Sequence, residues 1–182
     1  MIDLSILPSR LPSLQTAEGP VSIERIAAKH VDALCEASQY SVEHVKPWLG
    51  TGLCPVTIPA AKQCVTSLEQ SRQQNYGIAY LLITESQCLG MGVINYIHPL
   101  HLNANLGFWI RPEMTGKGLA VALSQRLIKL AFEQMKLVRL ELLIEPANKA
   151  SLRVAHKLNA EKEGLCRKRV MGRDALLFSL TR

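Results

Sequence analysis

The segment LGFWIRPEMTGKGLA spans Leu106 to Ala120 and reads as a strand, a short turn and the first residues of a helix. The strand is expected at Leu106–Ile110, because Pro112 cannot extend a sheet ladder. Beyond the turn, apolar residues recur at helical spacing and predict an amphipathic helix at Gly116–Met135. The repeating positions are Leu119, Leu123, Leu127, Leu130 and Ala131.

The N-terminus of that helix is a candidate phosphate-binding site. The first amides of a helix have no partner within it and carry a partial positive charge, which favours an anion. Glycines at this point let a bulky anion approach the backbone and tolerate unusual dihedral angles. The candidate residues are Thr115, Gly116, Lys117, Gly118 and Leu119. The alternative interpretation is that the two glycines simply make a turn.

Two widespread phosphate loops do not fit this segment. A Walker loop would need glycine at Arg111 and serine or threonine at Gly118. A dinucleotide-binding fingerprint would need glycine or alanine at Val121. The segment therefore suits a different phosphate ligand.

The remaining pattern predicts strands on both sides of a strand–helix–strand unit, and hence a mixed sheet flanked by helices. The other expected strands are Val21–Ile26, Gly77–Thr84, Cys88–Ile97, Val138–Ile144, Leu165–Val170 and Ala175–Leu180, with a turn at Glu85–Gln87. The other expected helices are Ala28–Tyr40, Ala60–Arg72 and a segment capped by Asn148 that runs to Leu158. Three prolines and two glycines at His44–Pro59 predict an irregular loop.

Composition limits the classes of protein that this chain can join. Its 182 residues suit a single domain over 1–182, and no apolar run reaches the length of a membrane helix. The first twelve residues lack the unbroken apolar stretch of a signal peptide. Five cysteines without a CxxC pair argue against a disulfide framework or a zinc site, and fit a reducing cytoplasm. His98 and His101 form HxxH without a nearby carboxylate, so we expect no metal.

The net charge of +6 is unevenly distributed. Eight lysines and arginines lie between Lys149 and Arg173, against Glu161 and Glu163 alone. Such a face should attract coenzyme phosphates, an acidic protein or RNA. The alternative is an ordinary solvated surface.

These motifs together resemble the GNAT acetyltransferase superfamily. Arg-Pro followed by Gly-Lys-Gly-Leu-Ala at a helix start is similar to its coenzyme A signature. The segment Ile144–Ser151 contains the Asn-x-x-Ser that follows the next strand, at Asn148 and Ser151. The segment His156–Gly164 is similar to a Lys-Leu-Gly-Phe…Glu-Gly pattern. The series looks most like the branch that acetylates the N-terminal serine or alanine of ribosomal proteins.

The chain departs from the family pattern in two places. Glu113 stands where glutamine or arginine is frequent, which removes one cationic contact with the coenzyme. Asn159-Ala160 replaces the usual glycine and aromatic residue. Asparagine can adopt the left-handed conformation that glycine would supply, so the turn is still expected to form.

The resemblance implies an α+β (mixed α/β) GNAT fold. Its central mixed sheet is mostly antiparallel, has about seven strands and is flanked by helices. Two parallel strands, Leu106–Ile110 and Val138–Ile144, splay apart, and their freed amides bind acetyl-CoA. A backbone amide near Trp109 or Ile110 would hold the acetyl oxygen, a contact typically worth roughly 3 kcal/mol. Asn148 would bind the pantetheine arm.

The chemistry implied is direct transfer of the acetyl group to an amine within a ternary complex. No cysteine has an evident low-pKa setting, which argues against an acyl-cysteine route. An α-amino group has a pKa near 7.7 to 8.0, so a weak base or solvent suffices. Glu163 is the candidate base from its Glu-Gly position, or else an exposed partner of Lys162 and Arg167.

Two further residues have candidate roles in the reaction. Ser151 is the candidate general acid for the departing thiolate, or else it helps to cap a helix. Trp48 either walls the acceptor site or anchors the core.

We therefore expect a cytoplasmic, acetyl-CoA-dependent N-acetyltransferase, monomeric or homodimeric, that acts on a protein N-terminus. An acidic ribosomal protein is the leading acceptor, and neither membrane nor DNA binding is expected. The alternatives are an enzyme for a small amine such as a polyamine or aminoglycoside, and a non-catalytic acetyl-CoA sensor or ribosome-associated module. A nucleic-acid binder that uses the basic face would leave the Gly116–Gly118 pattern without a role.

Overall fold

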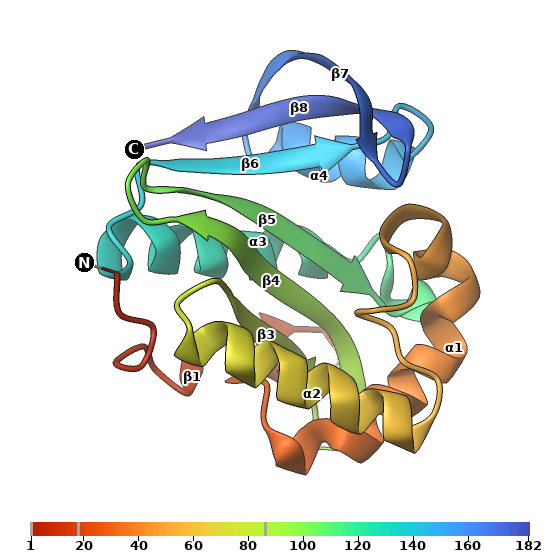
Figure 1. Ribbon diagram of the computed structural model, residues 1–182. Coiled ribbons are helices and arrows are strands. Elements are labelled where there is room, and N and C mark those ends of the chain that lie inside the picture. Colours follow the sequence, from red (N-terminus) through yellow and green to blue (C-terminus); the bar gives the residue numbers. More distant parts are fainter. Residues whose placement is uncertain (1, 18, 86) are drawn as a thin grey trace.

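The computed structural model describes residues 2–17, 19–85 and 87–182. Within this part of the chain the strands form one eight-stranded sheet in the order β1-β2-β3-β4-β5-β6-β8-β7 (Figure 1). All neighbours pair antiparallel except β5 and β6, which are parallel. The strands are β1 Arg10–Thr16, β2 Gly19–Arg25, β3 Ile78–Ile83, β4 Cys88–His98, β5 Asn103–Ile110, β6 Arg139–Ile144, β7 Glu161–Val170 and β8 Arg173–Thr181.

The helices cover the two faces of this sheet, each over its own apolar core. In Figure 1, α2 lies in front of the sheet and α3 lies behind it. One core joins α3 and α4 to the sheet around Leu123, Leu127 and Phe178, and the other joins α1 and α2 to it around Leu34 and Leu81. The helices are α1 Val31–Leu49, α2 Ile58–Gln73, α3 Leu119–Lys129 and α4 Lys149–Lys157, with short turns η1 Ala28–His30, η2 Pro112–Met114 and η3 Leu130–Gln134. The GNAT fold class expected from the sequence is confirmed.

The loop predicted from His44 to Pro59 is wrong in its first part, because α1 continues to Leu49. Val45 is 2% exposed and packs into the core, so burial outweighs the cost of Pro47 within the helix. Gly50 ends the helix with a φ of 68°, and its amide donates to the Lys46 carbonyl.

The sequence pattern does not predict β1, and this strand brings the count to eight instead of about seven. Pro12 hid it, because proline is a poor strand former. Proline is tolerated at an edge or a bulge, and β1 is both an edge strand and bulged between Leu11 and Leu14. Four other strands begin earlier than predicted: β2 and β8 by two residues, at Gly19 and Arg173, and β5 and β7 by three and four, at Asn103 and Glu161. The turn predicted at Glu85–Gln87 contains Ser86, which lies outside the described residues.

Candidate functional site

The two parallel strands separate at the centre of the sheet. β5 and β6 pair only from Asn103 to Asn105 with Arg139 to Glu141. Beyond this point each strand keeps its other neighbour, β4 for β5 and β8 for β6, while the facing edges part towards α1 and α4 (Figure 1). The facing backbone groups are therefore left to bind something other than each other. The expected splay of two parallel strands is confirmed.

A cavity of about 580 Å³ lies at this opening. Its walls come from β5 and β6, the N-terminus of α3 with the turn before it, α4 along its length, the C-terminal half of α1, and Val170 at the end of β7. It is large enough for a small-molecule ligand of the size of a coenzyme arm. Elements far apart in the sequence thus share one site.

The glycine turn before α3 forms one end of the cavity. Gly116 and Gly118 have φ angles of 78° and 81°, a region that side chains rarely adopt. A Cβ added at either glycine would meet no atom within 4 Å, so open space lies in front of this backbone. Gly118 is the N-cap of α3 and supplies no side-chain cap, which leaves the first amides of the helix for a ligand. Thr115 and Leu119 also line the cavity. Lys117 is not among its lining residues.

A buried arginine holds this turn against α1. Arg111 is 3% exposed, and its two terminal nitrogens donate to the Glu36 carboxylate at 2.8 and 2.9 Å. Its Nε donates to Glu113, and its guanidinium stacks 4.5 Å from the Tyr40 ring centre. Glu36 raises the pKa of Arg111 further, so this cation is permanent. Glu113, the departure from the family pattern, therefore braces the turn through Arg111.

Trp109 and Ile110 line the cavity from the end of β5. The Trp109 indole is 4% exposed and donates from Nε1 to the Leu53 carbonyl at 2.9 Å, so its side chain anchors the segment after α1. Ile110 belongs to the core on the opposite face. Both side chains are therefore taken up by the protein interior.

At the start of α4, Asn148 and Ser151 both line the cavity. Asn148 Oδ1 accepts a hydrogen bond from the Ser151 amide at 3.1 Å and caps the helix. Its side-chain NH₂ group remains for a ligand. Because Asn148 is the cap, the half-buried Ser151 hydroxyl does not serve as one, and it makes no hydrogen bond within the described residues. Downstream, Asn159 has a φ of 57°, so the left-handed turn expected there is confirmed.

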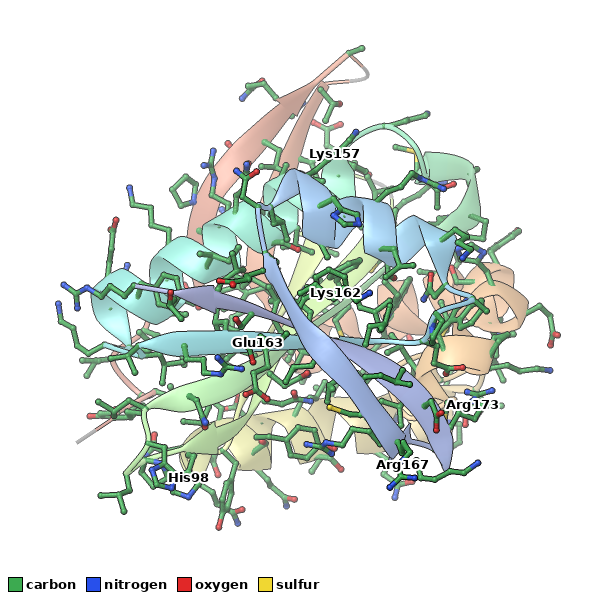
Figure 2. All side chains as sticks on the ribbon, turned by 90° about the horizontal axis from the view of Figure 1, so that it is seen from above. His98, Lys157, Lys162, Glu163, Arg167 and Arg173 are labelled. Atoms are coloured by element: carbon green, nitrogen blue, oxygen red, sulfur yellow. The ribbon has the colours of Figure 1, made fainter. Side chains whose placement is uncertain are left out.

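The structure does not bring Glu163 into the cavity. Arg139 binds its two carboxylate oxygens at 2.7 and 2.6 Å, and Ser179 Oγ donates to it at 2.6 Å. These contacts lower the pKa of Glu163 to about 2. Figure 2 shows Glu163 on β7. Its carboxylate links this strand to Arg139 on β6 and to Ser179 on β8. Its main partner is Arg139 and not Lys162 or Arg167, and so acidic a carboxyl group is a weak base.

The C-terminal half of α1 supplies two cavity residues. His44 and Trp48 are one helical turn apart on the same face, and both line the site. The sequence predicts Trp48 either at the acceptor wall or as a core anchor, and does not point to His44 because it predicts a loop here. His98 and His101 stack with ring centres 4.1 Å apart, and Figure 2 shows His98 far from the hairpin residues Arg167 and Arg173. No three potential metal ligands cluster in the part of the chain that the structure describes.

The basic stretch of the sequence divides into two surfaces. Lys149, Arg153 and Lys157 recur every four residues on α4 and line the cavity. Arg167, Lys168 and Arg169 are exposed on the β7–β8 hairpin. Glu145, the residue after β6, also lines the cavity and was missed. The sequence signal for Glu145 is its position directly after an alternating strand and before Pro146, where a strand end leads into a loop.

Comparison with known proteins agrees with this geometry. The Acetyltransferase (GNAT) domain matches residues 21–161, so the chain belongs to the GNAT acetyltransferase family. As a member of that family it is an acetyl-CoA-dependent N-acetyltransferase. No helix of the described residues is long and apolar enough to span a membrane.

The chain is similar along most of its length to several family members. It is 25% identical over 167 residues to the putative ribosomal N-acetyltransferase YdaF of Bacillus subtilis (strain 168), covering 88% of this chain and 90% of YdaF. Among solved structures, Mycobacterium smegmatis RimJ in complex with CoA-disulfide has a TM-score of 0.86 at 21% identity, covering 96% of this chain and 88% of RimJ. RimL, a ribosomal L7/L12 alpha-N-protein acetyltransferase in complex with coenzyme A, has a TM-score of 0.85 at 18% identity, covering 94% and 97%.

Proposed function

We propose that this N-acetyltransferase acetylates the α-amino group of a protein N-terminus, with ribosomal proteins as the leading class of acceptor. The observation that carries the proposal is a cavity lined by two chemically different groups of residues. One group is the glycine turn with the cations of α4, and the other is His44 and Trp48 with Val170 at the end of β7. We take the first group as the coenzyme end and the second as the acceptor end. The names of YdaF, a putative ribosomal N-acetyltransferase, and of RimL, a ribosomal L7/L12 alpha-N-protein acetyltransferase, support the same acceptor class.

The coenzyme fits the first end. Its pyrophosphate would accept hydrogen bonds from the backbone amides at Gly116–Leu119, and its remaining phosphate would face Arg153 and Lys157 on α4. The pantetheine arm would lie between β5 and β6, within reach of the Asn148 NH₂ group. A backbone amide near Trp109 or Ile110 would then polarise the thioester carbonyl.

The reaction is a direct transfer between the two bound substrates. The neutral amine attacks the thioester carbonyl carbon, an amide C–N bond forms, and the C–S bond breaks. The amine proton passes to water, which suffices because an α-amino group has a pKa near 7.7 to 8.0. The Ser151 hydroxyl gives its proton to the departing thiolate and recovers one from solvent. Glu163 takes no part in these steps, since its carboxylate is held by Arg139 and Ser179.

The cysteines support direct transfer. None of the five lines the cavity. Burial raises the pKa of Cys64 to about 11 and that of Cys88 to about 12, so neither thiol ionises near neutral pH. We also infer a single domain over 1–182 that works in the cytoplasm. One sheet joining β1 to β7 and five unpaired thiols support this inference.

An acidic segment behind the acceptor N-terminus fits the β7–β8 hairpin. Arg167, Lys168 and Arg169 have exposed side chains without an ion pair among the described residues. The next residue, Val170, lines the cavity, so the hairpin adjoins the mouth of the site. Attraction here would raise the rate at which an acidic protein finds the enzyme.

Mass spectrometry of reactions with acetyl-CoA tests the proposal. Peptides with a free N-terminus and an acidic or basic second half are compared with the same peptides blocked at the N-terminus. We expect acetylation of the free acidic peptides and none of the blocked ones. Acetylation of polyamines or aminoglycosides alone would transfer the function to small amines. Binding of acetyl-CoA without turnover on any acceptor would make the chain a non-catalytic module.

A further inference from the structure

Glu145 is the one carboxylate among the described residues that line the cavity. It follows directly after β6, and its side chain is 10% exposed. Its Oε1 is buried and accepts no hydrogen bond within the described residues. A buried carboxylate oxygen without a hydrogen bond is costly, so this atom is poised to accept one from a ligand.

Arg173 currently lies against this oxygen. Its Nη2 is 2.8 Å from Glu145 Oε1, yet the same nitrogen donates its hydrogen bond to the Pro47 carbonyl at the end of α1. The two groups are thus close ions that are not aligned as a hydrogen bond. The Arg173 side chain is 47% exposed and has water to move into, whereas the Glu145 side chain is 10% exposed and would be left as an uncompensated charge. Arg173 can therefore leave only in exchange for another cation.

The position of Arg173 at the edge of the molecule also allows its side chain to move away from Glu145. It begins β8 beside the exposed hairpin tip, and Figure 2 shows it next to Arg167 at that end of the molecule. Met171 at the tip lies 3.7 Å from a Cβ position at Gly50, so the hairpin rests on the end of α1. The guanidinium can turn towards solvent without disturbing a buried core.

The acceptor supplies a hydrogen-bond donor for the Glu145 carboxylate. An α-amino group with a pKa near 7.7 to 8.0 arrives mostly as an ammonium ion, which offers three hydrogen-bond donors and no acceptor. The other ionisable residues that line the cavity are His44, Lys149, Arg153 and Lys157, and none carries a negative charge. An ammonium ion entering this cavity therefore has Glu145 as its counter-ion.

We propose that Glu145 binds the α-ammonium group of the acceptor in the position that Arg173 holds in the free protein. Acceptor binding displaces Arg173, and the amine then loses its proton to water before it attacks. The inference rests on the proposed function, because it concerns the same acceptor end. It assigns Glu145 as the residue that distinguishes an amine from a blocked N-terminus.

The test compares Glu145→Gln with the wild type on a free-amine peptide and on its N-acetylated twin. We expect KM for the amine peptide to rise about tenfold, as for a lost charge-assisted hydrogen bond. The values of kcat and of KM for acetyl-CoA should stay within about twofold, and inhibition by the N-acetylated twin should not change. Glu133→Gln, an exposed carboxylate on η3, is the matched control and should behave as wild type.

Arg173→Gln reads the same exchange from the other side. It removes the competitor, so KM for the amine peptide should fall, and this gain should vanish in the double variant with Glu145→Gln. A purely structural role for Arg173 as a cap of α1 would instead lower stability and raise KM with or without Glu145.

The outcomes separate this inference from the proposed function. If peptides are acetylated but Glu145→Gln leaves KM unchanged, or weakens both twins equally, the assignment of Glu145 is overturned and the function stands. A rise in KM for Arg173→Gln would also overturn it. If no peptide is acetylated, the proposed function fails and takes the assignment with it. Unchanged acetyl-CoA affinity shows that each variant is folded.

Discussion

The two proposed ends of the cavity differ in the chemical groups that they offer to a ligand. The proposed coenzyme end offers backbone amides at Gly116–Leu119 and the parted edges of β5 and β6, beside the cations of α4. The proposed acceptor end offers side chains alone, namely those of His44, Trp48 and Glu145. Backbone groups cannot be altered without altering the fold, which suits a coenzyme that is always the same. Side chains can be exchanged singly, which would allow the choice of acceptor to change while the fold is kept.

The largest expected effect tests the chemistry between the two ends. Ser151→Ala removes the hydroxyl that we propose as proton donor to the thiolate, so kcat should fall about a hundredfold. KM for acetyl-CoA should change little, because the Asn148 cap uses the backbone amide of residue 151. Steady-state kinetics measure both quantities. Ser179→Ala, which removes a hydroxyl outside the cavity, should keep kcat, and an equal loss in both variants would contradict the role of Ser151.

The backbone nature of the coenzyme end is tested by Gly118→Ala. Open space surrounds this position, so the change introduces no clash, but a φ of 81° is strained for alanine by about 1–2 kcal/mol. Relaxation would turn the amides away from the pyrophosphate, and calorimetry should show acetyl-CoA affinity lowered about tenfold. Gly19→Ala is the control, since Gly19 has a φ of 114° and open space but lies at the start of β2, away from the cavity. It should cost stability and leave acetyl-CoA affinity unchanged.

The two basic surfaces should be separable by charge removal. Arg153→Gln on α4 should raise KM for acetyl-CoA about threefold to tenfold and leave KM for an acidic peptide unchanged. Arg167→Gln on the hairpin should do the reverse, with an effect that fades at high salt. Kinetics at two salt concentrations measure both. If the two variants changed the same KM, the division of the basic stretch would be wrong.

The smallest effect on activity is expected for Glu163→Gln. Because the carboxylate is outside the cavity and already bound by Arg139, kcat should stay within about twofold of wild type. A hundredfold loss would return Glu163 to the role of general base.

The same residue predicts how stability depends on pH. The pKa of Glu163 falls from 4.5 to about 2 on folding, so its stabilising effect is present above pH 4.5 and disappears as the pH falls towards 2. Scanning calorimetry should show wild-type Tm dropping over this window more steeply than the Tm of Glu163→Gln. Equal slopes would mean that the contact with Arg139 does not form in solution.

The elements around the coenzyme end were predictable from the sequence because their causes are local. The period of α3, the glycines before it and the Asn148 cap all act within a few residues. Asn159 replaced a family glycine and still adopts a φ of 57°. The resemblance to the GNAT family added the splay of β5 and β6, which residue spacing does not reveal.

The rest depended on contacts between distant residues. The family motif predicts Glu163 near the site as a base, but its carboxylate is bound by Arg139, which is 24 residues away in the sequence. The helical path of His44 and Trp48 depends on burial of Val45, and β1 depends on β2 for its partner.

By itself, the sequence determined that a strand enters a helix through two glycines and that a capped helix follows the next strand, because short-range sterics and hydrogen bonds decide these features. Tertiary structure alone decided which charges meet. Arg173 reaches Pro47 across 126 residues of chain and comes to lie against Glu145, so the acceptor end exists only once the sheet has assembled.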